Sequence, residues 1–310
     1  MIFRKEFRKV VLGLSLLTSV NLLCAQNVST KKIDSRETVI SNIPSKGNMQ
    51  FFVTGDDCRI AYQIDGDNDK PVLVLSNSIA TNFHMWDAQI PTLGKLFRII
   101  RFDTRGDGAS DNPSGDYSID RMGLDVIELL DYLHIEKVHF CGLSLGGFIG
   151  QWLGIHASDR INKLILSNTS SYLGPSSYFN NNIRSLREHP NMKGFADMFI
   201  KNWFPEKMIT ENDSIVSVFR DMVLNTNPQG LAGEFAAVRD ADMRKTISLI
   251  PVSTLIIAGK YDLVTKPEDS QRMAATIPDS KLIILPAVHI SNVLCQNDFE
   301  KSVIAFLLAR

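Results

Sequence analysis

Cysteine is scarce in this sequence and forms no metal-binding pattern. Four of the 310 residues are Cys, and none stands at the short Cys or His spacing that is typical of a zinc site. The sequence therefore predicts no metal ion. Cys141 ends an apolar stretch, where cysteine usually serves as a small buried hydrophobe. Pairing of Cys58 with Cys295 is left open.

An excess of charge of one sign is also absent. The formal net charge is −1, whereas proteins that bind nucleic acids or anionic membranes are commonly basic. No nucleic-acid partner is therefore predicted, and nothing in the sequence indicates an oligomeric state. No internal repeat or low-complexity tract interrupts the chain. With 44% hydrophobic residues, the chain is long and apolar enough for one large α/β domain.

A long apolar run is lacking too. The run from Val10 to Leu23 is shorter than the roughly 20 residues that a membrane-spanning helix needs. It follows a basic start and leads to a small residue, Ala25, so it has the three parts of a secretory signal peptide. We expect residues 1–25 to be cleaved on export to the periplasm or medium, with no stable membrane anchor; a retained anchor is the alternative. The polar residues 26–46 are expected to form a flexible leader.

From residue 47 to residue 310, expected strands alternate with expected helices. Gly55-Asp56-Asp57 separates the first two strands, which is a hairpin signal. The alternation that follows predicts a mostly parallel sheet with helices on both faces. The expected strands are 49–53, 59–64, 71–75, 97–102, 137–141, 163–166, 253–257 and 281–285, and the expected helices are 126–133, 149–155 and 299–308.

The pattern changes between about residues 170 and 248. Continuous β-branched runs become rare there, and segments of helical period, such as 195–203 and 215–224, are joined by Asn and Pro. We expect these residues to form a helical cap inserted between two strands of the sheet. The cap would lie over the strand ends.

The segment Gly142-Leu143-Ser144-Leu145-Gly146 carries the strongest chemical signal. A strand that enters a helix through Gly-x-Ser-x-Gly is the arrangement of a nucleophile elbow. The turn is tight, so the residues two before and two after the serine must lack bulk. The helix N-terminus that follows stabilises negative charge. A chance match in a glycine-bearing loop is the alternative, but the flanking strand and helix favour a nucleophilic Ser144.

Two residues near the C-terminus are expected to complete a catalytic triad with Ser144. A serine hydroxyl needs a base to take its proton, and the base needs a carboxylate to hold its tautomer. Asp262 and His289 each follow a predicted strand, at the edge of the sheet where ligands bind. Their order along the chain, Ser, then Asp, then His, is the order found in proteins with a nucleophile elbow. Asp240 and Asp242 also precede the histidine. Since both lie inside the expected cap, Asp262 is preferred.

An oxyanion hole requires two backbone N–H donors. Leu145, directly after the nucleophile, is expected to provide one. The second should come from the loop after the strand 71–75, and we choose Ile79. His84 lies near this loop and is a candidate contact to the substrate.

Several further motifs make the sequence resemble the 3-oxoadipate enol-lactonases of the α/β-hydrolase superfamily over roughly residues 70–310. The motifs are Ser76-Asn77-Ser78 before Met85-Trp86-Asp87, Arg101-Phe102-Asp103-Thr104-Arg105-Gly106, Leu124-Asp125-Val126 with Leu130-Asp131, Phe140 to Ser144 with Gly150 to Gly154, Arg239-Asp240-Ala241-Asp242 and His289-Ile290-Ser291-Asn292-Val293. The resemblance implies an α/β-hydrolase fold and hydrolysis of a small ester or lactone by Ser144, Asp262 and His289, with no cofactor.

The resemblance also points to cationic residues for an acidic substrate. The enol lactone carries a carboxylate, and the pattern best matches at Arg187 and Arg239 in the cap. Two features depart from the family: Asp107 stands where these lactonases usually have His, and they act inside the cell. A general exported carboxylesterase, with perhydrolase side activity, is therefore the first alternative. A non-catalytic binding protein on the same scaffold is the second.

Overall fold

The computed structural model describes residues 48–309 of the chain. The predicted signal peptide, residues 1–25, and the predicted leader, residues 26–46, lie outside the described residues. Among the helices that are described, none is long and apolar enough to cross a membrane.

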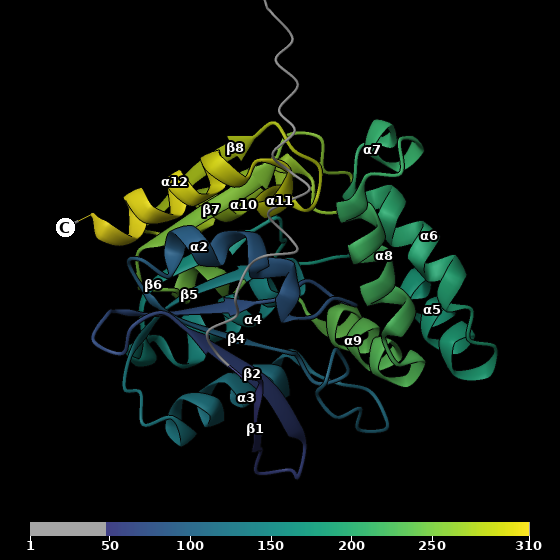
Figure 1. The fold of residues 1–310 in the computed structure, drawn as a ribbon, viewed down its shortest axis with the longest axis horizontal. Coiled ribbons are helices and arrows are strands. Elements are labelled where there is room, and N and C mark those ends of the chain that lie inside the picture. Colours follow the sequence, from purple (N-terminus) through teal and green to yellow (C-terminus); the bar gives the residue numbers. More distant parts are fainter. Residues whose placement is uncertain (1–47, 310) are drawn as a thin grey trace, which may run out of the picture. The chain divides into compact units, whose positions relative to one another are not determined.

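The centre of the fold is an eight-stranded sheet with the order β1-β2-β4-β3-β5-β6-β7-β8 (Figure 1). β1 pairs antiparallel with β2, and β2 pairs antiparallel with β4; every later pairing is parallel. The predicted hairpin and mostly parallel sheet are therefore present. The strands are β1 Gln50–Val53, β2 Arg59–Asp65, β3 Val72–Ser76, β4 Arg98–Phe102, β5 Val138–Leu143, β6 Ile161–Ser167, β7 Thr254–Gly259 and β8 Ser280–Leu285.

Helices cover both faces of this sheet because its central strands are apolar on both sides. Every residue of β7 is buried, for example, as expected for a continuous apolar run in a parallel sheet. α2 and α12 pack together, whereas α3 packs against α4, which lies on β3, β5 and β6. The covering helices are α2 Ile90–Leu93, α3 Ile119–Tyr132, α4 Leu145–His156, α10 Pro267–Thr276, α11 Ser291–Leu294 and α12 Gln296–Leu308, with the 3₁₀ helices η1 Phe83–Gln89, η2 Ser158–Arg160 and η3 Ile247–Leu249.

A helical insertion lies between β6 and β7, as the sequence predicts. In Figure 1 its helices form the group on the right-hand side of the sheet. α5 packs against α9 and α6 packs against α8, and the rings of Phe179, Phe199 and Phe235 meet between them. The cap helices are α5 Ser176–Glu188, α6 Met192–Trp203, α7 Glu206–Thr210, α8 Ser214–Asn225 and α9 Pro228–Asp240.

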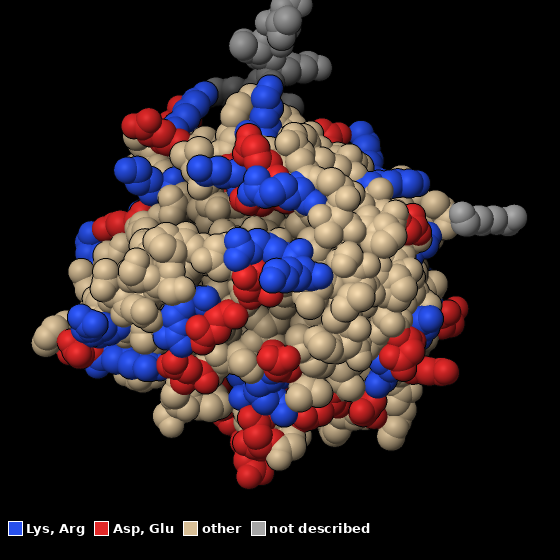
Figure 2. Space-filling model, turned by 180° about the vertical axis from the view of Figure 1, so that it is seen from behind, with Lys and Arg blue, Asp and Glu red and all other residues tan. Residues whose placement is uncertain are grey.

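The surface mixes charges of both signs. On the face drawn in Figure 2, Lys and Arg side chains alternate with Asp and Glu, in keeping with the net charge of −1. Cys58, Cys141 and Cys295 are free thiols, so the structure contains no Cys58–Cys295 pair among its described residues.

Candidate active site

Ser144 sits in a strained turn between β5 and α4. Its backbone has φ 56° and ψ −110°, a left-handed conformation that is costly for a residue with a side chain. A Cβ at position 142 would lie 2.0 Å from the Gly146 carbonyl oxygen, and a Cβ at position 146 would lie 2.4 Å from that of Ser76. Only glycine fits at either site. This close packing holds Ser144 at the carboxyl edge of the sheet, as the sequence motif predicts.

His289 and Asp262 are joined behind the serine. Nδ1 of His289 lies 2.8 Å from Oδ2 of Asp262. Because a carboxylate only accepts hydrogen bonds, Nδ1 carries the proton and Nε2 keeps a free lone pair. Both side chains are almost fully buried, and both residues follow strand ends, β7 for Asp262 and β8 for His289.

The Asp262 carboxylate is held by an unusually complete set of donors. Oδ1 accepts from the backbone N–H groups of Val264 and Thr265 at 2.9 and 3.1 Å. Oδ2 accepts from the Thr265 hydroxyl at 2.8 Å and from the Asn168 amide at 3.0 Å. Burial alone would raise the pKa of Asp262, but the His289 charge and these hydrogen bonds outweigh it and lower the pKa to about 2. The carboxylate therefore stays ionised beside the imidazole.

Two backbone N–H groups beside Ser144 have no acceptor within the described part of the chain. Leu145 is the first residue of α4, where a helix leaves its N–H groups unpaired. The N–H of Ile79, in the loop after β3, is likewise unpaired. The neighbouring N–H groups are occupied: Gly146 donates to the Asn77 carbonyl at 2.9 Å, and Ala80 donates to Glu234 at 3.3 Å.

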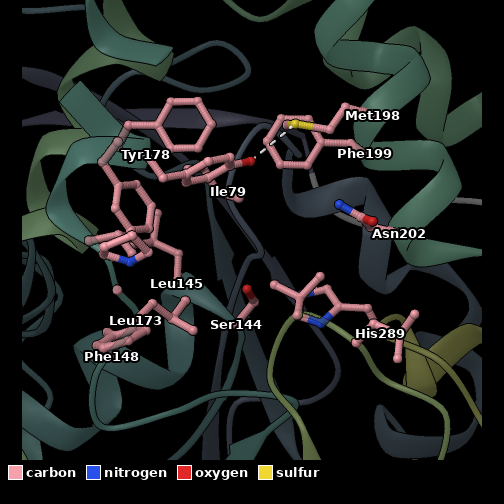
Figure 3. A pocket seen from close by; sticks show the side chains of 17 residues that line it. Ile79, Ser144, Leu145, Phe148, Leu173, Tyr178, Met198, Phe199, Asn202 and His289 are labelled. Carbon is pink, nitrogen blue, oxygen red and sulfur yellow. Dashed lines mark hydrogen bonds between the residues drawn. The ribbon is translucent and has the colours of Figure 1, made fainter. Parts of the chain in front are cut away.

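Ser144, His289 and these two residues face one cavity of about 500 Å³. In Figure 3 the Ser144 hydroxyl points into this cavity with His289 beside it, and Asn202 lies on the side of the cap. Tyr178 donates a hydrogen bond to the Met198 sulfur at 3.3 Å across the cap wall. The lining residues are Ile79, Ser144, Leu145, Phe148, Leu173, Gly174, Pro175, Tyr178, Phe179, Met198, Phe199, Asn202, Phe235, Val238, Leu263, Val264 and His289.

No side chain in this lining carries a full charge apart from a protonated His289. Arg187 and Arg239, which the sequence suggested for a substrate carboxylate, instead share the exposed Asp116, at 2.6 and 2.9 Å. His84 lies in η1, 2.9 Å from Asp87, and faces a different, smaller cavity. The structure therefore does not bring these three residues together with Ser144.

Sequence reasoning missed three residues of the site. Asn168 follows β6 directly, so it is a polar residue at the same sheet edge as the triad, and that signal was available. Thr265 could be found only from the turn it forms with Asp262. Asn202 depends on the direction of a cap helix, for which the sequence holds no signal. Among residues 48–309, no group of three or more His, Cys, Asp or Glu side chains could hold a metal ion.

Comparison with known proteins identifies the fold family of this chain. The family described as "alpha/beta hydrolase fold" matches residues 71–294. The 3-oxoadipate enol-lactonase 2 of Acinetobacter baylyi is 36% identical over 255 residues, which cover 82% of this chain and 95% of the relative.

Two solved structures are similar over most of their length. A hydrolase from Pseudomonas aeruginosa is 47% identical with a TM-score of 0.84, covering 85% of this chain and 100% of that one. The enol-lactonase from Burkholderia xenovorans is 33% identical with a TM-score of 0.81, covering 84% and 100%. Sheet order, inserted cap and sequence similarity agree, and the chain belongs to the α/β-hydrolase fold family.

Proposed function

We propose that this protein hydrolyses carboxylic esters or lactones through an acyl-enzyme on Ser144. One observation carries the proposal: a strained serine and the free Nε2 of an Asp-bound histidine face one cavity beside two unpaired N–H groups. This is the set of groups that acyl transfer needs.

In the first step, the Ser144 hydroxyl attacks the substrate carbonyl and Nε2 of His289 takes its proton. Asp262 stabilises the imidazolium that forms. The carbonyl oxygen becomes an oxyanion, which the N–H groups of Leu145 and Ile79 stabilise. The C–O bond to the leaving group then breaks, the imidazolium protonates that oxygen, and the acyl group remains on Ser144.

In the second step, water takes the place of the leaving group. His289 removes a proton from the water as its oxygen attacks the acyl carbon, and the same two N–H groups stabilise the second oxyanion. The bond to Ser144 breaks, the serine recovers its proton from His289, and the carboxylic acid leaves. No step requires a cofactor.

An enol lactone is the first candidate substrate. The support is the similarity to proteins named 3-oxoadipate enol-lactonase and enol-lactonase. Ring opening of an enol lactone releases an enol that becomes a ketone, so its leaving group departs more readily than a simple alcohol. The mechanism above applies to it unchanged.

A neutral ester or lactone is the second candidate, and the cavity lining favours it. A substrate carboxylate would lose its water on entering this apolar cavity, and such a loss is costly unless a cation or several donors replace it. Arg187 and Arg239 are paired with Asp116 outside the lining. The polar side-chain groups that the cap offers there are the Asn202 amide and the Tyr178 hydroxyl, both uncharged.

A fluorophosphonate probe and an ester panel test the proposal together. Wild-type protein should be labelled at Ser144, and Ser144→Ala should not be labelled. Hydrolysis of aryl esters and lactones that Ser144→Ala lacks would support the enzyme. Correctly folded wild-type protein that neither reacts with the probe nor hydrolyses any member of the panel would instead be a non-catalytic binding protein.

A further inference from the structure

Two buried carboxyl groups, Asp107 and Glu234, meet next to the oxyanion loop. Asp107 lies in the turn after β4 and is 1% exposed, and Glu234 lies on α9 of the cap and is fully buried. Their side chains lie close enough for one carboxyl group to hydrogen-bond to the other. Neither carboxyl forms an ion pair with any cation among residues 48–309. Two acids in direct contact without a cation require explanation, because burying unpaired charge is costly.

A shared proton explains this contact. Both oxygens of Asp107 and Oε1 of Glu234 lack any N–H or O–H donor from the rest of the described chain, so one carboxyl must be the donor to the other. Burial, followed by the neighbouring Glu234 charge, raises the pKa of Asp107 well above its usual range. Burial also raises the pKa of Glu234, to about 7. Oε2 of Glu234 accepts the N–H of Ala80, whereas neither oxygen of Asp107 has a donor of its own. The negative charge is therefore better placed on Glu234, with Asp107 as the acid that donates to it.

The second oxygen of Glu234 reaches the oxyanion loop. Oε2 accepts the N–H of Ala80 at 3.3 Å, the peptide that follows Ile79. Ala80 has φ 55°, a left-handed conformation that a residue with a side chain adopts only when its surroundings enforce it. The loop conformation that presents the Ile79 N–H therefore depends on an acceptor supplied by the cap.

We propose that Glu234, held by the Asp107 acid, is a positioning residue for the oxyanion hole. Its carboxylate fixes the Ala80 peptide and thereby aims the neighbouring Ile79 N–H at the cavity. This assignment rests on the proposed function, because an oxyanion hole has a role only in acyl transfer.

Cap helix α9, which carries Glu234, packs tightly against the turn that carries Asp107, so a shift of one would move the other. A Cβ at position 230 on α9 would lie 2.3 Å from the Gly106 carbonyl oxygen, so the helix rests directly on the turn that carries Asp107. Within residues 48–309, Asp103 and Tyr117 are the further ionisable groups that interact with the pair. Asp103 accepts from the N–H groups of Phe83 and Ala109, both at 2.8 Å. Neither group offers a positive charge.

The test compares Glu234→Ala with Glu234→Gln on an aryl ester, using kcat per fluorophosphonate-titrated site. Glu234→Ala removes the acceptor and should lower kcat about 10- to 100-fold with little change in KM, less than the 10²–10³-fold for a lost donor. Glu234→Gln keeps an oxygen for Ala80 and an amide donor for Asp107, so it should stay within about threefold of wild type. Gln229→Ala, an exposed truncation on the same helix, is the control.

The pH profile provides a readout that a merely structural role would not change. The pair loses its shared proton as pH rises, and two adjacent carboxylates would then repel and release the loop. Wild-type kcat should therefore fall on the alkaline side. Asp107→Asn keeps a donor to Glu234 that cannot titrate, so this alkaline fall should disappear, as it should in Glu234→Gln.

Three results would overturn the assignment. The first is wild-type kcat in Glu234→Ala, and the second is a Glu234→Gln as slow as the alanine variant. The third is an alkaline fall unchanged in Asp107→Asn, and this measurement decides the matter if Glu234→Ala does not fold. An inactive, unlabelled wild-type protein would refute the hydrolase itself and this assignment with it, so the two failures are distinct.

Discussion

Arg105 donates two parallel hydrogen bonds to Asp125, from Nε to Oδ2 and from Nη2 to Oδ1, both 2.7 Å long. Both side chains are about 3% exposed, and the pair ties the turn after β4 to α3. These two residues belong to the motifs that suggested the family. The pair does not line the cavity beside Ser144, so this part of the signature stabilises the scaffold.

Removing one partner of this pair should destabilise the protein strongly. Arg105 also pairs with Asp56, so Asp125→Ala removes two hydrogen bonds to a buried charge without leaving that charge unpaired. Such a loss typically costs about 1.5–3 kcal/mol, and the free energy of unfolding measured in urea should fall accordingly. Lys207→Ala, which removes an exposed pair with Glu211, is the control and should change little. Equally small decreases in the free energy of unfolding in Asp125→Ala and Lys207→Ala would contradict a structural role for the Arg105–Asp125 pair.

The triad makes a sharp prediction for activity. Ser144→Ala and His289→Ala should each lower kcat on the order of 10⁶-fold, because triad members act as a unit. Asp262→Asn should lower it by about 10⁴-fold, since the amide favours the wrong imidazole tautomer. Asp242→Asn is the matched control, because Asp242 pairs with the exposed Arg244. A severe loss in Asp242→Asn with normal rates in Asp262→Asn would identify a different acid.

Asp262 should also make the free energy of unfolding depend on pH in the acidic range. Its folded pKa of about 2 lies below the unfolded value of about 3.9, a difference worth about 3 kcal/mol. A lowered pKa means that this stability is present above about pH 4 and is lost as pH falls towards 2. Urea unfolding at a series of pH values should show the advantage of wild type over Asp262→Asn shrinking across this window. If the free energies of unfolding of wild type and Asp262→Asn changed in parallel with pH, the proposed contribution of Asp262 would be refuted.

Substrate charge separates the two candidate substrates. The uncharged lining predicts that wild-type kcat/KM for a neutral aryl butyrate exceeds that for an aryl ester of equal length ending in a carboxylate, by about tenfold or more. Asn202→Arg would place a cation on the cap wall and should narrow or reverse this ratio. A wild-type preference for the carboxylated ester would favour the acidic enol lactone.

Arg187 and Arg239 supply the control for that experiment. Because both pair with Asp116 away from the cavity lining, Arg187→Ala and Arg239→Ala should change kcat/KM for the two esters by the same factor. A selective rise in KM for the carboxylated ester would show that one of them reaches the substrate.

Export is testable without the enzyme assay. When the full chain is expressed with its own leader in a bacterial host, intact-mass measurement should find a mature form that begins near Gln26. The reason is the basic start and apolar run before Ala25. Recovery of only the uncleaved chain from the cytosolic fraction would contradict this prediction.

The sheet and its polar edge could be predicted because their signals are local. Buried parallel strands are continuous apolar runs, and the expected strand 253–257 overlaps the observed β7, Thr254–Gly259, to within two residues at each end. Side chains that follow such runs must lie at one edge, so Ser144, Asp262 and His289 could be selected together. Their distances could not, since these depend on turns such as the one between Asp262 and Thr265.

The cap was less accessible to prediction because its side chains are directed by tertiary packing. Arg187 and Arg239 lie on helices whose rotation decides whether they face the cavity or Asp116, and the partner is distant in the sequence. α9 carries Gly230 and Gly233, which weaken a helical pattern. Glu234, an acid in the middle of α9 among small and apolar residues, was a signal that could have been used.

The backbone strain at Ser144 has a consequence for the choice of residue there. Its φ of 56° suits glycine, whereas a residue with a side chain pays roughly 1–2 kcal/mol in this region. Ser144→Gly should therefore yield a protein without hydrolase activity whose Tm is higher than that of wild type. Thermostability screens of this chain would select against the nucleophile unless activity were measured alongside.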